Sequence, residues 1–288
     1  MHCKHLNLNV EVDVLTTGAL ADIVNAILES LLFQRHQIPL VYKTYRYYVR
    51  KWSEEENELS EENVTSTTEF LRRQKENATK TNSSISAMKE LVRKAFKNKC
   101  IKSLRFLFGS TTYTPKEAYT IHIPTEEISS NHSHEQHPMT IGNLNQTLLS
   151  LLTHPDLYTI FSSNLNPTNI YLELEISKQI IDLKTMSNAK VDIIPKEFCT
   201  LPPSCKDVQI HLLHTGNTSS SSLHCCKDLQ VYKDFMDLHL EDNAATIEAD
   251  SDSNKCKNIL YKTNEWWEAD IYIRGFKEQG SKCLNMWS

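Results

Sequence analysis

Residues 33–40, FQRHQIPL, close an apolar helix and fix where the chain changes direction. Before them, residues 18–37 place apolar side chains at the three-four spacing of a half-buried helix: Leu20, Ile23, Val24, Ile27, Leu28, Leu31 and Leu32. Pro39 lacks the amide hydrogen that a helix interior needs, so we expect the helix to end before it. Residues 42–51 then read as a short, basic and aromatic second helix.

Composition bounds the classes of protein that the chain can belong to. Its 288 residues, 40% of them hydrophobic, suit one domain, and 6 glycines argue against a fold built on glycine-rich phosphate loops. A net charge of −5 and a pI near 6.2 give no basic footprint for nucleic acid. No apolar run approaches the ~20 residues of a membrane span, and the first residues lack a secretory signal. We therefore expect a protein of the nucleus and cytoplasm, with its 8 cysteines reduced.

The first half of the chain predicts helices followed by a hairpin. Residues 53–83 are rich in Glu, Asn, Ser and Thr and predict a disordered linker. Apolar spacing predicts a helix over residues 84–98, and alternation predicts strands over 101–108 and 118–123, joined as an antiparallel hairpin.

The second half predicts an α+β fold. Residues 141–153 form a helix with an unusually wide apolar face, which His154–Pro155–Asp156 interrupts before a continuation over 157–161. Strands are predicted over 170–176 and 208–214, a polar insertion over 215–258, and two strand-like runs over 257–277. Helices mixed with a few strands, without regular alternation, favour one α+β domain over residues 1–288.

Residue patterns for catalysis are weak. The chain has no Gly-x-Ser-x-Gly, no Walker loop and no His-Glu-x-x-His, and Cys225–Cys226 beside His224 sits in a solvated stretch. We therefore predict no catalytic residue, no cofactor and no metal. One alternative stays open, a zinc-stabilised protein that uses the imidazoles of residues 132–137, HSHEQH.

Several short blocks occur in a telling order: FQRHQIP at 33–39, FLFG at 106–109, TPKEAY at 114–119, IPK at 194–196, WWEA at 266–269 and RGFKE at 274–278. Together they resemble the comet family of spindle-checkpoint adaptors, a HORMA-like family. The resemblance covers residues 31–51, 104–123, 193–212 and 264–278. It implies a HORMA-like domain, with a central antiparallel sheet backed by about three helices and a C-terminal segment that resembles a seat belt.

The resemblance also implies a function. It predicts a non-catalytic adaptor that binds the closed conformer of the Mad-two checkpoint protein and presents it to a AAA+ ATPase of the pachytene-checkpoint type. Such an adaptor silences the mitotic checkpoint and associates with the spindle or kinetochore in mitosis, without nucleic acid or membrane. A HORMA subunit of the autophagy-initiation complex is the alternative within this fold.

Site residues follow from the same resemblance. Gln34 matches the family's interface glutamine, and Leu148 takes the place of its aromatic anchor. Arg35, Leu151 and Leu152 are the predicted neighbours. Pro195–Lys196 matches the motif that contacts the ATPase, where proline fixes an extended backbone and lysine offers a positive charge.

Overall fold

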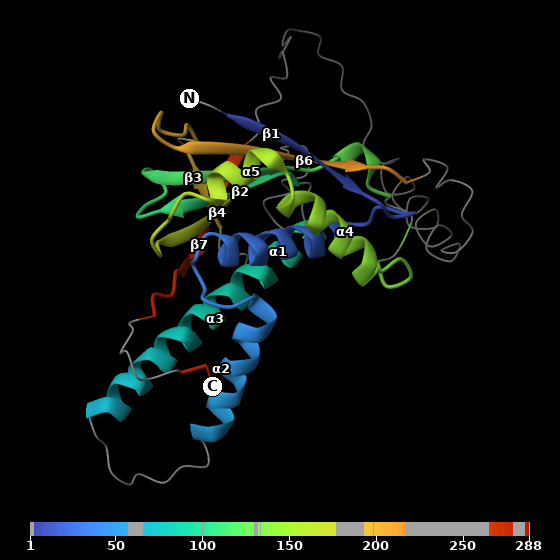
Figure 1. The fold of residues 1–288 in the computed structure, drawn as a ribbon. Helices are drawn as coiled ribbons and strands as arrows, with labels where there is room; N and C mark the ends of the chain where they lie inside the picture. Colours follow the sequence, from blue (N-terminus) through green and yellow to red (C-terminus); the bar gives the residue numbers. More distant parts are fainter. Residues whose placement is uncertain are drawn as a thin grey trace, which may run out of the picture.

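The fold is built on one mixed sheet. The computed structural model describes residues 3–56, 66–98, 101–129, 132, 134–176, 193–197, 199–216, 265–278 and 286–287. Within them the seven strands lie in the order β1-β6-β3-β2-β4-β7-β5 (Figure 1). The strands are β1 (Lys4–Val10), β2 (Ile101–Gly109), β3 (Pro115–His122), β4 (Asn169–Ile176), β5 (Ile193–Lys196), β6 (Lys206–His214) and β7 (Glu265–Arg274).

Strand directions confirm part of the prediction and correct part of it. The hairpin of β2 and β3 is antiparallel as expected, and β4, β7 and β5 continue the antiparallel pairing. The expected antiparallel sheet therefore describes the strands from β3 to β5 but not the whole sheet, because β6 lies parallel to both β1 and β3. The α+β class is confirmed.

Five α-helices accompany the sheet in the described residues: α1 (Thr17–Gln34), α2 (Tyr42–Glu56), α3 (Ser66–Asn98), α4 (Ile141–Leu152) and α5 (Pro155–Phe161). A 3-10 turn covers Thr125–Glu127. Helix α1 lies against one side of the sheet, while α2 and α3 run side by side and project away from it (Figure 1). No helix among the described residues is long and apolar enough to cross a bilayer.

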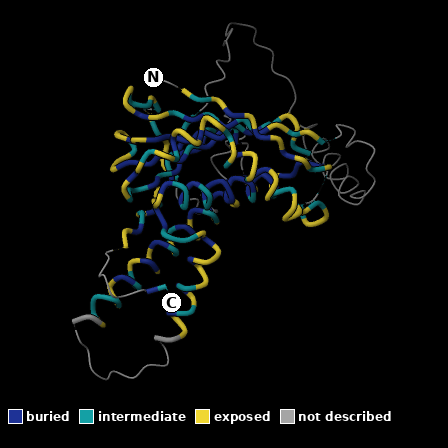
Figure 2. Tube along the Cα trace, in the orientation of Figure 1, coloured by how far each residue is buried: buried dark blue, intermediate teal, exposed yellow. Residues whose placement is uncertain are grey.

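The core forms where strand alternation meets the apolar stripe of α1. In β1 the side chains of Leu6, Leu8 and Val10 are buried and the residues between them are outside the core. They join the buried residues of the other strands and of α1 in one hydrophobic cluster. Figure 2 shows this as dark-blue backbone concentrated in the sheet and in α1.

Helix α1 ends by its own backbone bonds before Pro39 is reached. His36 has a φ of 54°, in the left-handed region. The Gln37 amide donates to the carbonyl of Leu32 at 2.8 Å, and the His36 amide to that of Phe33 at 3.0 Å. This pair of bonds is the Schellman arrangement of a helix end. It stops α1 at Gln34, earlier than the predicted residue 37, and turns the chain sharply.

The predicted linker over residues 53–83 is wrong where the structure describes it. Helix α2 continues to Glu56, and α3 begins at Ser66. The side chains of α3 that face the molecule recur every three or four residues: Gln74, Ala78, Thr81, Ile85, Met88, Val92 and Ala95. Two of the first three are polar, so a prediction based on the spacing of apolar residues does not detect the buried face of this part of the helix. The hydroxyl of Tyr45 in α2 donates to the Ala78 carbonyl at 2.9 Å and holds the two helices together.

Two further predictions fall partly outside the described residues. The polar insertion predicted over 215–258 lies there except for Thr215 and Gly216, and so does the first of the two C-terminal strand-like runs. The second run is β7. The first strand, β1, was not predicted at all.

Candidate functional site

An apolar ridge on α4 and α5 is the most conspicuous candidate for a protein-binding surface. Ile141 is 77% exposed and Leu149 62%, and Tyr158 on α5 is 74% exposed. Leu148 and Leu152 on α4 are half-buried, and Leu148 also packs against the core. We call these five residues the docking ridge. Exposed apolar side chains that gather on one face commonly mark an interaction site.

The opposite side of α4 holds the helix on the sheet. Thr147 and Leu151 are buried, and the Thr147 hydroxyl lies 3.3 Å from the Asn9 carbonyl of β1. The side-chain amide of Asn143 donates to the Glu11 carbonyl at 2.6 Å. Leu151 is therefore a core residue, and its side chain is not available on the surface as the sequence prediction required.

Local sequence explains why α4 and α5 are separate. The Thr140 hydroxyl caps α4 by accepting a hydrogen bond from the backbone amide of Asn143 at 3.2 Å. Pro155 occupies the first turn of α5, where its missing amide hydrogen costs nothing, and His154 caps that helix. The predicted interruption at His154–Pro155–Asp156 is thus confirmed.

Gln34 is half-buried at the last position of α1. Its neighbour Phe33 packs against the core from the edge. Helix α1 contacts α4, and Arg35, the residue after Gln34, bonds to carbonyls at the end of α5. A glutamine amide there can both donate and accept a hydrogen bond.

Arg35 does not lie on the surface. Its side chain is fully buried, and its guanidinium donates twice to the Glu117 carboxylate of β3, each bond 2.8 Å long. The third nitrogen donates to the carbonyls of Ile160 at 3.1 Å and Ser163 at 2.9 Å, at the C-terminal end of α5. The prediction that Arg35 touches a partner is therefore not supported by its position. Instead, Arg35 sets where α5 sits relative to α1 and β3.

The Glu117 carboxylate is satisfied from several sides. Tyr119 donates its hydroxyl hydrogen to it at 2.8 Å, and the Lys206 ammonium lies 3.3 Å away. Burial raises the pKa of Tyr119 well above its ordinary value, and the negative charge of Glu117 raises it further. Tyr119 therefore stays a neutral donor at physiological pH.

Pro195 and Lys196 lie in β5, the strand at one edge of the sheet. Pro195 is exposed, and so is Ile194, at 56%. The Lys196 side chain is only 7% exposed, and its ammonium binds the Glu173 carboxylate of β4 and lies 3.6 Å from that of Glu268 in β7. The lysine thus anchors the edge strand, and the expected mobile positive charge is not observed.

Glu173 is almost fully buried beneath this strand. Burial raises its pKa, while Lys196 and Arg105 act in the opposite direction. The guanidinium of Arg105 is 3.4 Å from Glu173 and stacks on the Trp266 ring, 4.2 Å from its centre. This network ties β2, β4, β5 and β7 together next to Pro195.

The imidazoles of residues 132–137 are engaged with neighbours. Among the residues that the structure describes, no group of three or more His, Cys, Asp or Glu side chains is placed to hold a metal ion. His132 and His137 lie edge to face, and the His134 ring is 3.2 Å from the Thr16 hydroxyl and 3.6 Å from the Asp22 carboxylate. His224, Cys225 and Cys226 lie outside the described residues.

Three ridge residues were not predicted as site residues: Ile141, Leu149 and Tyr158. A signal existed for Leu149, since it sits about 100° around the helix from Leu148 and widens the apolar face. Ile141 and Tyr158 had no such signal, because their exposure depends on how the helices lie on the sheet.

The exposed apolar face on α4, more than the α+β architecture itself, is a feature typical of a protein-binding module. Residues 15–141 match the family model described as p31comet: Mad1 and Cdc20-bound-Mad2 binding. This match assigns residues 15–141 to the p31comet family, a spindle-checkpoint family of binding proteins and not of catalysts, and the family implies a HORMA-like fold. No curated protein matches the chain.

Gln34 and Arg35 lie within the matched residues, whereas Leu148 and Pro195 lie beyond them. The family match favours the hypothesis of a spindle-checkpoint protein over that of an autophagy subunit.

Proposed function

We propose that this protein is an adaptor that binds the closed, Cdc20-bound conformer of Mad2 and presents it to a AAA+ ATPase. The docking ridge carries the proposal, because a p31comet-family chain exposes apolar side chains on one helical face. Leu148 and Leu149 would supply the apolar contact, with Gln34 as the polar anchor beside it. Arg35 and Leu151 would act from the core, by holding the helices in place.

The adaptor's contribution is a difference in affinity between two client conformers. A ligand shifts a conformational equilibrium only by as much as it prefers one state. The energy for opening the client would come from ATP hydrolysis at the motor. Removal of closed Mad2 in this way would silence the mitotic checkpoint.

The edge strand β5 would form the contact with the ATPase. Pro195 and Ile194 are the side chains that it exposes, while Lys196 keeps the strand attached through Glu173. Replacing Pro195 with Ser should weaken the complex with the ATPase and leave Mad2 binding intact, as a pull-down of the three components would show.

The Mad2 contact is tested by replacing Gln34 and Leu148 together with Ala. Truncation of an interface anchor typically costs about 2 kcal/mol or more, which is roughly a thirtyfold rise in Kd. We expect the variant to lose co-elution with closed Mad2 in size-exclusion chromatography and to show that rise in calorimetry.

Tyr47→Ala is the matched control, since this side chain is 62% exposed but lies on α2. It should bind closed Mad2 like the wild type. Unchanged binding of the Gln34→Ala, Leu148→Ala variant, with its melting temperature intact, would refute the proposed docking face.

A further inference from the structure

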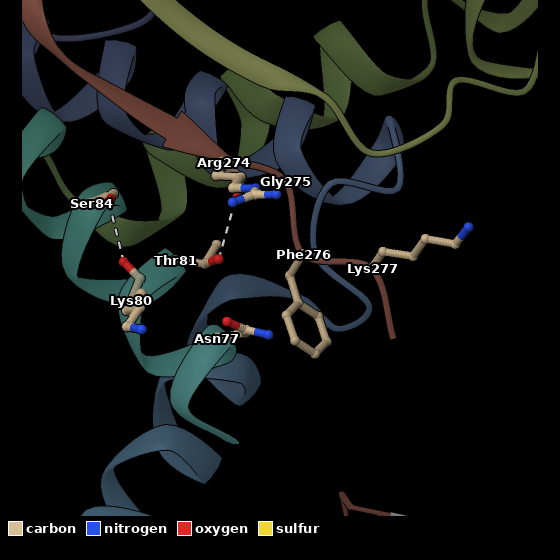
Figure 3. Close-up of a pocket in the computed structure, with 8 residues that line it drawn as sticks. All are labelled: Asn77, Lys80, Thr81, Ser84, Arg274, Gly275, Phe276 and Lys277. Carbon is tan, nitrogen blue, oxygen red and sulfur yellow. Dashed lines mark hydrogen bonds between the residues drawn. The ribbon is translucent and has the colours of Figure 1, made fainter. Parts of the chain in front are cut away.

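A cavity of about 340 Å³ lies where α3 faces the end of β7 (Figure 3). The α3 side contributes Asn77 and Lys80, and the other side contributes Arg274, Phe276 and Lys277. None of these residues belongs to the docking ridge or to β5. The cavity therefore needs an explanation of its own.

The walls of this cavity are fixed by the backbone. The Thr81 hydroxyl donates to the Arg274 carbonyl at 3.1 Å, and the Gly275 amide to the Thr168 carbonyl at 2.8 Å. A Cβ atom at Gly275 would lie 2.4 Å from the side-chain oxygen of Gln37, so the chain approaches more closely there than another residue would allow. The Phe276 amide donates to the Gln37 carbonyl at 2.8 Å.

The lining is positively charged in a chain that is negative as a whole. Lys80, Arg274 and Lys277 line the cavity, and no carboxylate does. The whole chain carries a net charge of −5. In the part of the chain that the structure describes, none of these three side chains forms an ion pair. Like charges gathered without counter-charges repel one another, and a bound anion relieves that repulsion.

The polar groups specify the anion further. The hydroxyls of Thr81 and Ser84 donate to backbone carbonyls, so their hydrogens are already engaged. The remaining side-chain donors of the lining are Lys80, Arg274 and Lys277, together with the Asn77 amide. Lys277 extends outward beyond Phe276 (Figure 3). Guanidinium and ammonium groups on a fixed frame suit a phosphoryl group, whose several oxygens accept from more than one donor at once.

We propose that this cavity binds a phosphate monoester, of the kind carried by a phosphorylated serine or threonine side chain. The volume is at the lower end of the ~300–1,000 Å³ of ligand pockets, which fits one side chain and its phosphate. The apolar face of Phe276 lies beside the space for the carbon atoms of that side chain. The site is independent of the contacts with Mad2 and the ATPase.

The test uses the full chain and the probe N-acetyl-O-phosphoserine methylamide, at constant ionic strength. Calorimetry should show saturable binding that the unphosphorylated probe lacks. Binding should weaken below about pH 6, where a phosphate monoester loses its second negative charge. Lys80→Glu and Arg274→Glu should each reduce affinity tenfold or more.

Lys94→Glu is the matched control, because Lys94 is also exposed on α3 but lies outside the cavity. It should bind the probe like the wild type, and all three variants should keep the wild-type melting temperature, since they change exposed side chains. An equal loss in Lys94→Glu would overturn the site in favour of a general charge effect. Equally tight binding of inorganic phosphate would overturn the monoester assignment, and absence of binding would overturn both.

Discussion

The Arg35 side chain joins three elements at one buried point: the end of α1, strand β3 and the carbonyls that close α5. Sequence resemblance marked this arginine correctly as important but assigned it to the surface. No local pattern shows that a charged residue is buried, because its partner Glu117 is distant in sequence and only the fold brings the two together. The same holds for Lys196 and Glu173.

Replacing Arg35 with Met should destabilise the protein by about 3 kcal/mol or more, because it leaves the Glu117 carboxylate buried with Lys206 as its remaining cation. Urea unfolding measures the loss. The double change Arg35→Met with Glu117→Gln removes the unpaired buried charge and should recover part of the lost free energy of unfolding. Arg72→Met, in an exposed ion-pair network of α3, should leave the urea midpoint almost unchanged. A similar loss in both single variants would contradict the buried-charge explanation.

Three imidazoles from neighbouring strands form a row on the sheet: His5 in β1, His211 in β6 and His122 in β3. The His122 and His211 rings are stacked 4.5 Å apart, and the side-chain oxygen of Gln209 accepts a hydrogen bond from the His122 ring at 2.6 Å. Burial lowers the pKa of His211 below its ordinary 6.5, and the charges of His122 and His5 lower it further.

This shift predicts a loss of stability in acid. Below about pH 6.5 the unfolded chain binds a proton at His211 that the folded chain takes up only at lower pH, so the free energy of unfolding falls as the pH decreases. His211→Gln should flatten that fall between about pH 7 and 5 in urea titrations. The two proteins should show no pH-dependent difference above pH 7.5. Parallel curves across the whole range would rule out the row as the cause.

At the scale of elements, α3 shows most clearly where composition misleads. The segment 66–83 is polar enough to resemble a linker, yet its buried seam continues the three-four spacing of the helix through Gln74, Ala78 and Thr81. In strand β1 the local signal is plain, because Leu and Asn alternate along it. Its place in the sheet is not local, because it depends on the parallel pairing with β6, which is distant in the sequence. The β2–β3 hairpin and helices α1 and α4 were predicted well because their signals are local.

Helix α2 is also held by a residue near the C-terminal end of the chain. The Trp287 ring lies 4.9 Å from that of Trp52 and 5.5 Å from that of Tyr45, both in α2, and 6.2 Å from that of Phe276. Each such ring pair contributes about 0.5–1.5 kcal/mol beyond its buried area.

Trp287→Ala should therefore lower the free energy of unfolding by about 2 kcal/mol or more, measured by guanidinium denaturation. Trp287→Phe, which keeps an aromatic ring, should lose less than half of that amount. If Trp287→Ala unfolds at the wild-type midpoint, the C-terminal ring does not secure α2.

For the whole molecule, the predicted class and the observed architecture agree in outline and differ in connectivity. The α+β class, the hairpin and the order of most elements follow from periodicity and from the family resemblance. The mixed strand directions, the burial of Arg35 and the anchoring of Lys196 do not, since each depends on contacts between residues far apart in the chain. The Schellman end of α1 lies between these cases, because it needs His36 in a conformation that no spacing reveals.

The pairing of β1 with β6 has a consequence for synthesis. Lys4 is matched with Val208, which lies 204 positions later in the chain. At ~5–20 residues per second, a ribosome takes roughly 10–40 s to deliver that distance. In the described structure β1 pairs with β6 alone. During that interval the growing chain therefore carries β1, with its leucine side chains, unpaired. The addition of β1 to the sheet is thus a late event, set by translation as much as by packing.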